Sequence, residues 1–129
     1  NISFGDANAM INELKNLETN TGNLIFSQVV PSYTQISIPI IKEYQELMKK
    51  YYPNENLSFI SLEAFISAKV LIYAISKIEG ERTREKLTKS LKNISKNDFE
   101  GLNLNYKNTQ LLNKTYLFSY ENEHFNEIK

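Results

Sequence analysis

The chain has 129 residues, which is long enough for one domain with its own hydrophobic core. Apolar residues make up 41% of it and charged residues 23%, a composition typical of a folded globular protein and not of a disordered one. The 15 basic residues balance the 15 acidic ones, so no net charge attracts nucleic acid or an anionic membrane. The chain has no cysteine, which excludes disulfides and thiolate metal sites.

The beginning of the sequence is not typical of a natural start. It has neither an initiating Met nor a leader in which basic residues precede an apolar run. We therefore expect the chain to be a processed or trimmed piece of a longer protein.

The first part of the chain predicts a helix, a strand and a second helix. The first helix spans about 6–17, with Asp6 at its N-cap or in its first turn. Its inward face is expected to carry Ala9, Met10, Leu14 and Leu17. β-Branched and apolar residues over 23–30, closed by Pro31, are typical of a buried strand. The second helix spans about 38–51. Its inward residues are predicted to be Ile40, Ile41, Tyr44, Leu47 and Met48.

The next predicted helix, 61–79, is apolar around most of its circumference. Between residues 64 and 75 its only polar side chains are Ser67 and Lys69, and Gly80 is expected to end it. No run reaches the roughly 18 uninterrupted apolar residues that a membrane span needs. The pattern is therefore that of a buried helix and not of a membrane element.

The last part of the chain predicts one more helix and a few strands. Thr83 is a suitable N-cap for a helix over 84–93. Strands are expected at 102–106 and 114–120, and a further short pairing is expected around Phe125. These strands make a small sheet, so the apolar helix before them needs cover on several sides. We expect that cover to come from protein outside this sequence or from a second copy of the chain.

Four stretches carry a resemblance to a known family. They are SFGDANAM (3–10), the strand, proline and helix of 22–53, the helix pair of 61–91 and FEGLNLNY (99–106). In this order and at these spacings they resemble the C-terminal third of the type 1 periplasmic solute-binding proteins, the family of the leucine/isoleucine/valine-binding protein of ABC importers. The N-terminal two-thirds of that family, with the loops that hold an amino-acid carboxylate, have no counterpart here, so the resemblance implies no particular ligand.

The resemblance implies an α/β fold, in which the chain forms part of a two-lobed periplasmic-binding-protein type 1 structure. Residues 1–30 and 100–129 would belong to the second lobe, and residues 31–99 would form a helical segment of the first. A hinge would lie at Val30, Pro31 and Ser32. The apolar helix would pack under the sheet of the first lobe.

The same resemblance implies ligand-binding residues, each with a structural alternative. Gly5 and Asp6 would meet the ammonium group of an amino-acid ligand, whereas Asp6 as an N-cap explains the same position. Tyr33 would line the cleft between the lobes, or be an ordinary loop tyrosine. Glu63 would contact the ligand or a hinge backbone group, or be a first-turn acid that the helix dipole stabilises by about 0.3–1 kcal/mol.

The predicted function is the capture of a small solute, such as an amino acid or a similar small carboxylate, in the periplasm or another extracytoplasmic space of a bacterium. The partner would be the membrane subunits of an ABC importer. One alternative is the ligand-sensing domain of a membrane receptor with the same fold, and another is a small helical interaction domain. No catalytic motif is present and His124 is the only histidine, so we expect no enzyme activity, no metal and no cofactor.

Overall fold

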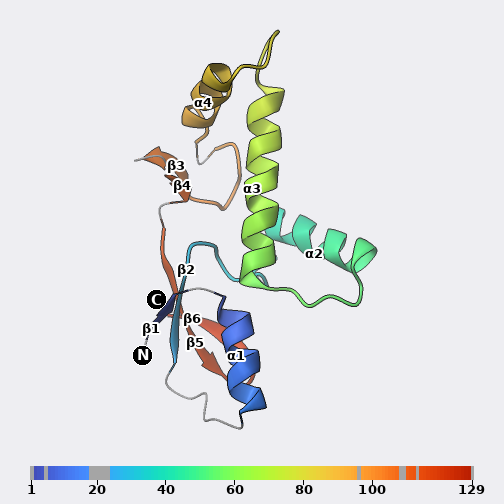
Figure 1. Cartoon of the computed structure of the whole chain (residues 1–129), viewed down its shortest axis with the longest axis vertical. Helices are drawn as coiled ribbons and strands as arrows, with labels where there is room; N and C mark the ends of the chain where they lie inside the picture. The colour runs from blue at the N-terminus through green and yellow to red at the C-terminus, as the bar shows by residue number, and fades with distance from the viewer. Residues whose placement is uncertain are drawn as a thin grey trace.

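The computed structural model describes residues 2–4, 6–17, 24–95, 97–107, 110–112 and 114–128. Within these ranges the chain forms four helices and six strands (Figure 1). In chain order they are β1 (Ile2–Phe4), α1 (Ala7–Asn16), β2 (Ile25–Gln28), α2 (Pro39–Tyr51), α3 (Phe59–Ser76), α4 (Arg84–Lys92), β3 (Leu104–Lys107), β4 (Gln110–Leu112), β5 (Tyr116–Glu121) and β6 (His124–Ile128).

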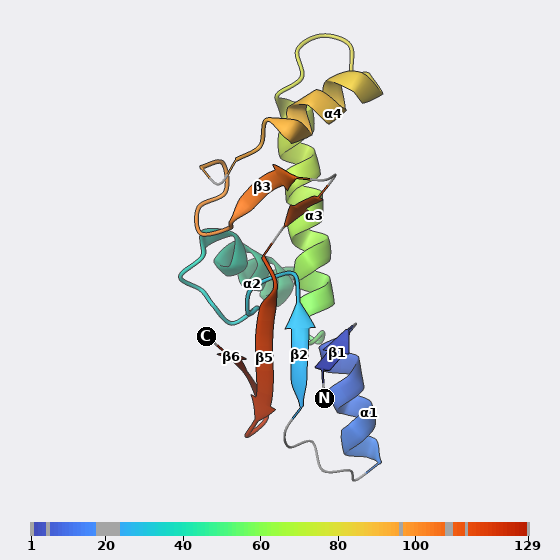
Figure 2. The same ribbon diagram turned by 90° about the vertical axis from the view of Figure 1, so that its left-hand side faces the viewer.

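The elements gather in two halves of an elongated molecule. One half, the sheet half, is a four-stranded sheet of order β1-β2-β5-β6 with α1 beside it. The other, the helical half, contains α2, α3, α4 and the separate hairpin β3–β4, which lies beside α3 and α4. Figure 2 shows β1, β2 and β5 side by side, with α3 rising beyond the end of the sheet.

The sheet joins the beginning of the chain to its end. β1 and β2 are parallel, whereas β5 is antiparallel to both β2 and β6. Phe26 of β2 stands opposite Phe118 of β5, and both side chains are fully buried. Along β5 the side chains of Tyr116, Phe118 and Tyr120 are buried while those between them are more exposed, as the period of a pleated strand requires.

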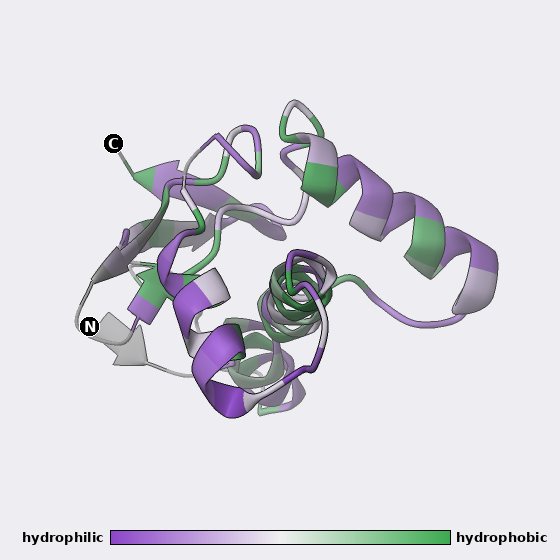
Figure 3. Ribbon diagram, turned by 90° about the horizontal axis from the view of Figure 1, so that it is seen from above, coloured by the Kyte–Doolittle hydropathy of each residue, from purple (hydrophilic) through white to green (hydrophobic). Residues whose placement is uncertain are grey.

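The helix α3 carries the longest apolar surface in the molecule. Ser58 caps it through a hydrogen bond from the Ser61 backbone N–H. Its buried residues follow helical spacing and are Phe59, Leu62, Ile66, Val70 and Ala74. In the described part of the chain α3 is the one helix long and apolar enough to cross a membrane by length and composition, yet only 28% of it is buried. Figure 3, which looks along α3, shows hydrophobic residues on several of its sides.

Most of the predicted elements are confirmed, with their bounds shifted by a few residues. Thr83 caps α4 by accepting a hydrogen bond from the Lys86 N–H, as predicted. On α2, Ile40, Ile41 and Tyr44 are buried and the other two predicted residues are half-buried. The strand β4 was not predicted, because its three residues lack a readable alternation.

Two details of the predicted helices are wrong. The buried residues of α1 are Ala7 and Ile11, while Ala9 and Met10 are exposed and Leu17 is 71% exposed. The buried face runs through Ala7 and Ile11, one helical turn apart, and is therefore rotated from the predicted one, which did not include them. The helix α3 ends at Ser76, so Gly80, with a φ of +71°, belongs to the connection that follows.

The pairing of β2 with β5 predicts that two neighbouring residues respond very differently to truncation. Phe118→Ala removes a side chain that is 0% exposed and is expected to lower the free energy of unfolding by about 3–5 kcal/mol, or to abolish a cooperative transition. Leu117→Ala, on the opposite face of the strand and 38% exposed, is expected to cost less than about 1 kcal/mol. Urea unfolding followed by circular dichroism measures both values. Equal costs would contradict the observed face assignment.

Candidate functional site

A groove of about 580 Å³ runs along α1, from Asp6 before its first turn to Lys15 near its end. Ligands of open α/β sheets bind outside the carboxyl ends of parallel strands, and Asp6 and Tyr33, which follow the parallel strands β1 and β2, line one part of this groove. Its walls come from α1, from the loop after β2, from the approach to α3 and from the β5–β6 hairpin. The lining residues include Asp6, Asn8, Asn12, Lys15, Tyr33, Ser58, Tyr120, Glu123 and Phe125.

Asp6 lines the groove and also caps α1. Its Oδ1 accepts hydrogen bonds from the backbone N–H groups of Asn8 and Ala9, at 3.0 and 3.2 Å. The N-cap interpretation of Asp6 is therefore confirmed. Within the described residues, Asp6 takes part in no ion pair. A carboxylate charge thus stands at the edge of the groove, while its role toward a ligand stays a prediction.

Tyr33 lies in the same groove, held by partners on three elements. Its hydroxyl accepts a hydrogen bond from Asn8 Nδ2 at 3.2 Å, and its carbonyl accepts one from Gln45 Nε2 at 2.7 Å. Its ring meets that of Phe59 edge-on, with centroids 4.9 Å apart. Burial raises the pKa of the Tyr33 phenol, which favours the neutral hydroxyl.

Asn8 is the groove residue that the sequence did not reveal. Besides its bond to Tyr33, its Oδ1 accepts a hydrogen bond from the backbone N–H of Phe59 at 3.2 Å. One side chain on α1 therefore contacts both the loop after β2 and the start of α3. Its partners are 25 and 51 residues away in the sequence, so no local pattern announces the role.

The remaining charges of the groove neutralise one another. Lys15 Nζ lies 2.9 Å from Glu123 Oε1 and 5.7 Å from the centre of the Tyr120 ring. The hydrogen bond between Lys15 and Glu123 raises the pKa of Lys15 and lowers the pKa of Glu123. Tyr120 in turn packs against Phe125, with ring centroids 4.9 Å apart. The groove is thus aromatic and polar, and Asp6 carries its one charge that has no ion-pair partner among the described residues.

The other predicted residues lie elsewhere. Val30 and Pro31 are buried and Ser32 is half-buried in the connection between β2 and α2, which joins the two halves of the molecule (Figure 1). Their hinge role stays a prediction. Gly5 lies outside the described residues. His124 begins β6 and is exposed, and the described residues contain no group of side chains arranged to hold a metal ion.

Glu63 is not brought together with Asp6 and Tyr33. It is exposed and lines a different groove, of about 360 Å³, between α3 and the β3–β4 hairpin. That groove is mainly aliphatic, lined by Val29, Ile66, Val70, Leu71, Leu91, Leu104, Leu111 and Leu112 among others. The first-turn alternative for Glu63 is wrong, because α3 starts at Phe59 and has no acid in its first turn.

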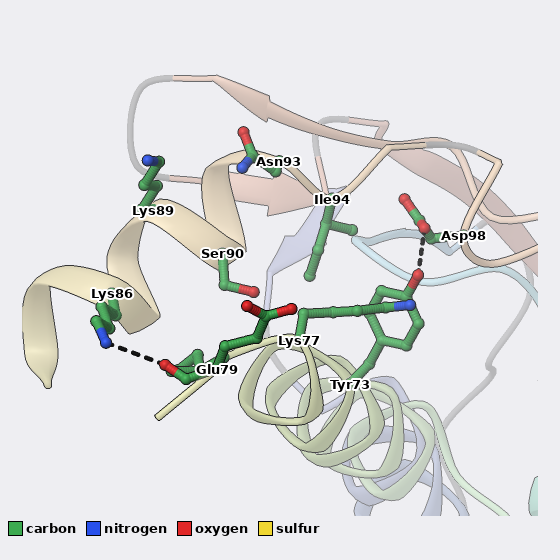
Figure 4. Close-up of a pocket in the computed structure, with 10 residues that line it drawn as sticks. Tyr73, Lys77, Glu79, Lys86, Lys89, Ser90, Asn93, Ile94 and Asp98 are labelled. Atoms are coloured by element: carbon green, nitrogen blue, oxygen red, sulfur yellow. Dashed lines mark hydrogen bonds between the residues drawn. The ribbon is translucent and has the colours of Figure 1, made fainter. Parts of the chain in front are cut away.

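A third hollow, of about 650 Å³, lies between the end of α3 and α4 (Figure 4). Asp98 and Lys86, two of its charged residues, have hydrogen-bond partners among the surrounding residues. Asp98 accepts hydrogen bonds from the Tyr73 hydroxyl and from Ser95. These bonds, most of all the one from Tyr73, hold the pKa of Asp98 below its usual range. Lys86 Nζ donates to the Glu79 carbonyl at 3.0 Å. None of the predicted site residues lines this hollow.

Comparison with known proteins identifies the architecture. No family model matches the sequence, and no curated protein matches it. Two solved structures match its fold. The first is a possible leucine/isoleucine/valine-binding protein from Rhodopirellula baltica SH 1, with a TM-score of 0.81 and 24% identity over 99% of this chain. The second is a substrate-binding periplasmic protein from Ralstonia solanacearum, with a TM-score of 0.70 and 20% identity over 92% of this chain.

The chain therefore has a partial periplasmic-binding-protein type 1 fold, as predicted. It spans 35% of the length of each of the two structures. Because the first match covers nearly the whole chain, α3 is an integral helix of this fold. The alternative of a small helical interaction domain is wrong, since β1, β2, β5 and β6 form a shared sheet and the chain follows the α/β architecture of both neighbours.

The capping geometry predicts how Asp6 variants affect stability. Asp6→Ala removes the acceptor for two backbone N–H groups and is expected to lower the free energy of unfolding by about 1 kcal/mol. Asp6→Asn keeps an acceptor oxygen and is expected to leave stability almost unchanged. Urea unfolding of both variants checks this. A loss for Asp6→Asn as large as that for Asp6→Ala would contradict a capping role.

The Tyr73–Asp98 bond predicts a pH-dependent effect. Because the folded-state pKa of Asp98 is lowered, the carboxylate stabilises the fold above its unfolded pKa of about 3.9, and this contribution is lost as the pH falls through the folded value. Tyr73→Phe is expected to lower stability at pH 7 by about 0.5–1.5 kcal/mol and to have a smaller effect at acid pH. Urea unfolding over a pH series measures this, with Tyr52→Phe at an exposed position as the control. A pH-independent loss would contradict the assignment.

Proposed function

We propose that the chain is the C-terminal portion of an extracytoplasmic solute-binding protein. The observation that carries this proposal is the fold match over 99% of the chain to a structure described as a possible leucine/isoleucine/valine-binding protein. The second neighbour, described as a substrate-binding periplasmic protein, supports the same class. In this role the chain binds and releases a solute and performs no chemical step.

The two halves of the molecule are proposed to belong to two lobes. The sheet half would be part of one lobe and the helical half part of the other, with the hinge at Val30, Pro31 and Ser32. The predicted division placed residues 100–129 with the sheet. The hairpin β3–β4 lies beside α3, which favours a return to the second lobe only at β5. A ligand that contacts both lobes would stabilise their closed arrangement.

The groove along α1 is proposed as this chain's share of the ligand cleft. Asp6 supplies a carboxylate without an ionic partner among the described residues, and the rings of Tyr33, Tyr120 and Phe125 line the same space. A carboxylate and aromatic rings attract an ammonium group by charge-assisted hydrogen bonding and cation–π contact. These features favour an amino acid or a related small solute with an ammonium group.

The uncovered surface of α3 supports the proposal that further protein packs on this chain. Ile72 is 64% exposed, and the aliphatic groove beside α3 opens on the same helix. Apolar surface of this extent favours association. We propose that the remainder of the first lobe covers α3 in the complete protein, and that the 129 residues alone would self-associate. Delivery of the solute to the membrane subunits of an ABC importer belongs to the same proposal.

A ligand screen on the complete protein tests this function. Amino acids and small carboxylates are added one at a time, and a solute that binds only the folded state raises the melting temperature. Asp6→Asn keeps an acceptor oxygen but removes the negative charge, and is expected to weaken binding of an ammonium-bearing solute by about 10- to 100-fold because the hydrogen bond no longer joins two opposite charges. Isothermal titration calorimetry measures the change.

The control is Glu121→Gln, an exposed acid on β5 outside the groove, which is expected to bind the solute like the wild type. Asp6→Asn binding with wild-type affinity would contradict the role of Asp6. If no small solute raised the melting temperature while a partner protein did, the solute-binding proposal itself would fail.

A further inference from the structure

The two halves of the molecule meet at the first residue of α3. The Phe59 side chain is 1% exposed and reaches from the helical half into the sheet half. Its ring lies 4.8 Å from that of Phe118 on β5 and 5.1 Å from that of Phe125 on β6, measured between centroids. The Tyr33 ring closes the same cluster at 4.9 Å. The Phe59 ring is thus in contact with three other aromatic rings.

A hydrogen bond to Asn8 holds the same residue from the sheet half. The first N–H groups of a helix have no acceptor within the helix, and that of Phe59 donates to Asn8 Oδ1 at 3.2 Å. The other end of the amide donates to the Tyr33 hydroxyl at 3.2 Å. The carboxamide therefore uses its acceptor on α3 and its donor on the connecting loop at the same time.

We propose that Asn8 is a positioning residue that fixes the angle between the two halves and, with it, the shape of the groove. This inference rests on the proposed function in treating the halves as parts of two lobes. Aromatic packing around Phe59 favours proximity but tolerates rotation, because apolar burial is non-directional. Hydrogen bonds weaken steeply when their angle changes. The directional restraint on the junction thus comes from Asn8.

The position of Asn8 also couples this restraint to the groove. Its side chain lines the groove together with Tyr33, so a solute that hydrogen-bonds to either residue competes for groups that hold the junction. Binding in the groove and rotation at Phe59 would then be linked through one amide. A ligand shifts a conformational equilibrium by its differential contacts with the two arrangements, and Asn8 provides such a contact.

The test is a distance measurement between the halves in the complete protein without solute. The 129 residues contain no cysteine, so Asn16→Cys on α1 and Lys49→Cys on α2, both exposed, supply two spin-label sites, with cysteines elsewhere replaced by serine. Pulsed electron paramagnetic resonance then reports the distribution of distances. We expect a narrow distribution for the doubly labelled parent and a broader, displaced one when Asn8→Leu is added. Tyr33→Phe, which removes only one of the two bonds, is expected to broaden the distribution less.

Two further variants separate positioning from general damage. Asn8→Asp keeps an acceptor for the Phe59 N–H and can accept from the rotatable Tyr33 hydroxyl, so it is expected to restore the narrow distribution. Asn12→Leu changes a second groove residue of α1, which is exposed and lies one turn away from Asn8, and is expected to leave the distribution unchanged. Circular dichroism and the urea midpoint show that each variant is folded.

The inference is overturned if the folded Asn8→Leu variant gives the same distance distribution as the parent. It is also overturned if the distribution of Asn8→Asp is as broad as that of Asn8→Leu. Should Asn8→Leu fail to fold, an unbroadened distribution for Tyr33→Phe would overturn it in the same way. Because no solute is present, the result is independent of the ligand screen. If the protein binds no solute and Asn8→Leu still broadens the distance distribution, the proposed function is refuted. The positioning role of Asn8 then remains supported.

Discussion

The burial of Phe59 among aromatic rings is the contact on which the arrangement of the molecule depends. Phe59 begins α3, Tyr33 lies in the loop after β2, and Phe118 lies on β5. The centroid of the Phe59 ring is 4.9 Å from that of Tyr33 and 4.8 Å from that of Phe118. Phe118 is also paired with Phe26 in the sheet, so the same cluster closes the sheet and seats the helix. A sheet that joins both ends of the chain and a helix that leaves it at an angle are thus held by one set of contacts.

The groove shows how one residue can serve both folding and recognition. Asp6 satisfies two N–H groups of α1 with a single oxygen, yet its charge has no ionic partner among the described residues. Lys15, the cation of the same groove, is instead paired with Glu123 and lies above Tyr120. Because Oδ1 accepts both of the capping hydrogen bonds, the capping role of Asp6 does not exclude a ligand-binding role for the same carboxylate.

Helical periodicity and capping residues made most elements predictable, and four ordered motifs indicated the fold. The α1 face was misassigned, because a ten-residue amphipathic pattern fits more than one rotation and packing against the core decides which face is buried. Strand β1 emerged only from the resemblance, since three residues carry too little alternation. Asp6 and Tyr33 were predicted for one site and share one groove, whereas Asn8 was missed because its contacts join segments distant in sequence. Glu63 was grouped with them by its motif, but α3 carries it to another face.

The sheet also constrains the order in which the chain can fold. β2 obtains its antiparallel neighbour only from β5, in the register Ile25 to Ser119 and Gln28 to Tyr116, so roughly ninety residues of intervening chain must be placed before that ladder closes. Contacts of such sequence separation form late and slowly. During synthesis, β1 and β2 would leave the ribosome with an open backbone edge that stays unpaired until β5 is made. Contacts within the α2–α3–α4 segment are closer in sequence and can form earlier, whereas Phe59 obtains its partners Phe118 and Phe125 only once β5 and β6 are made.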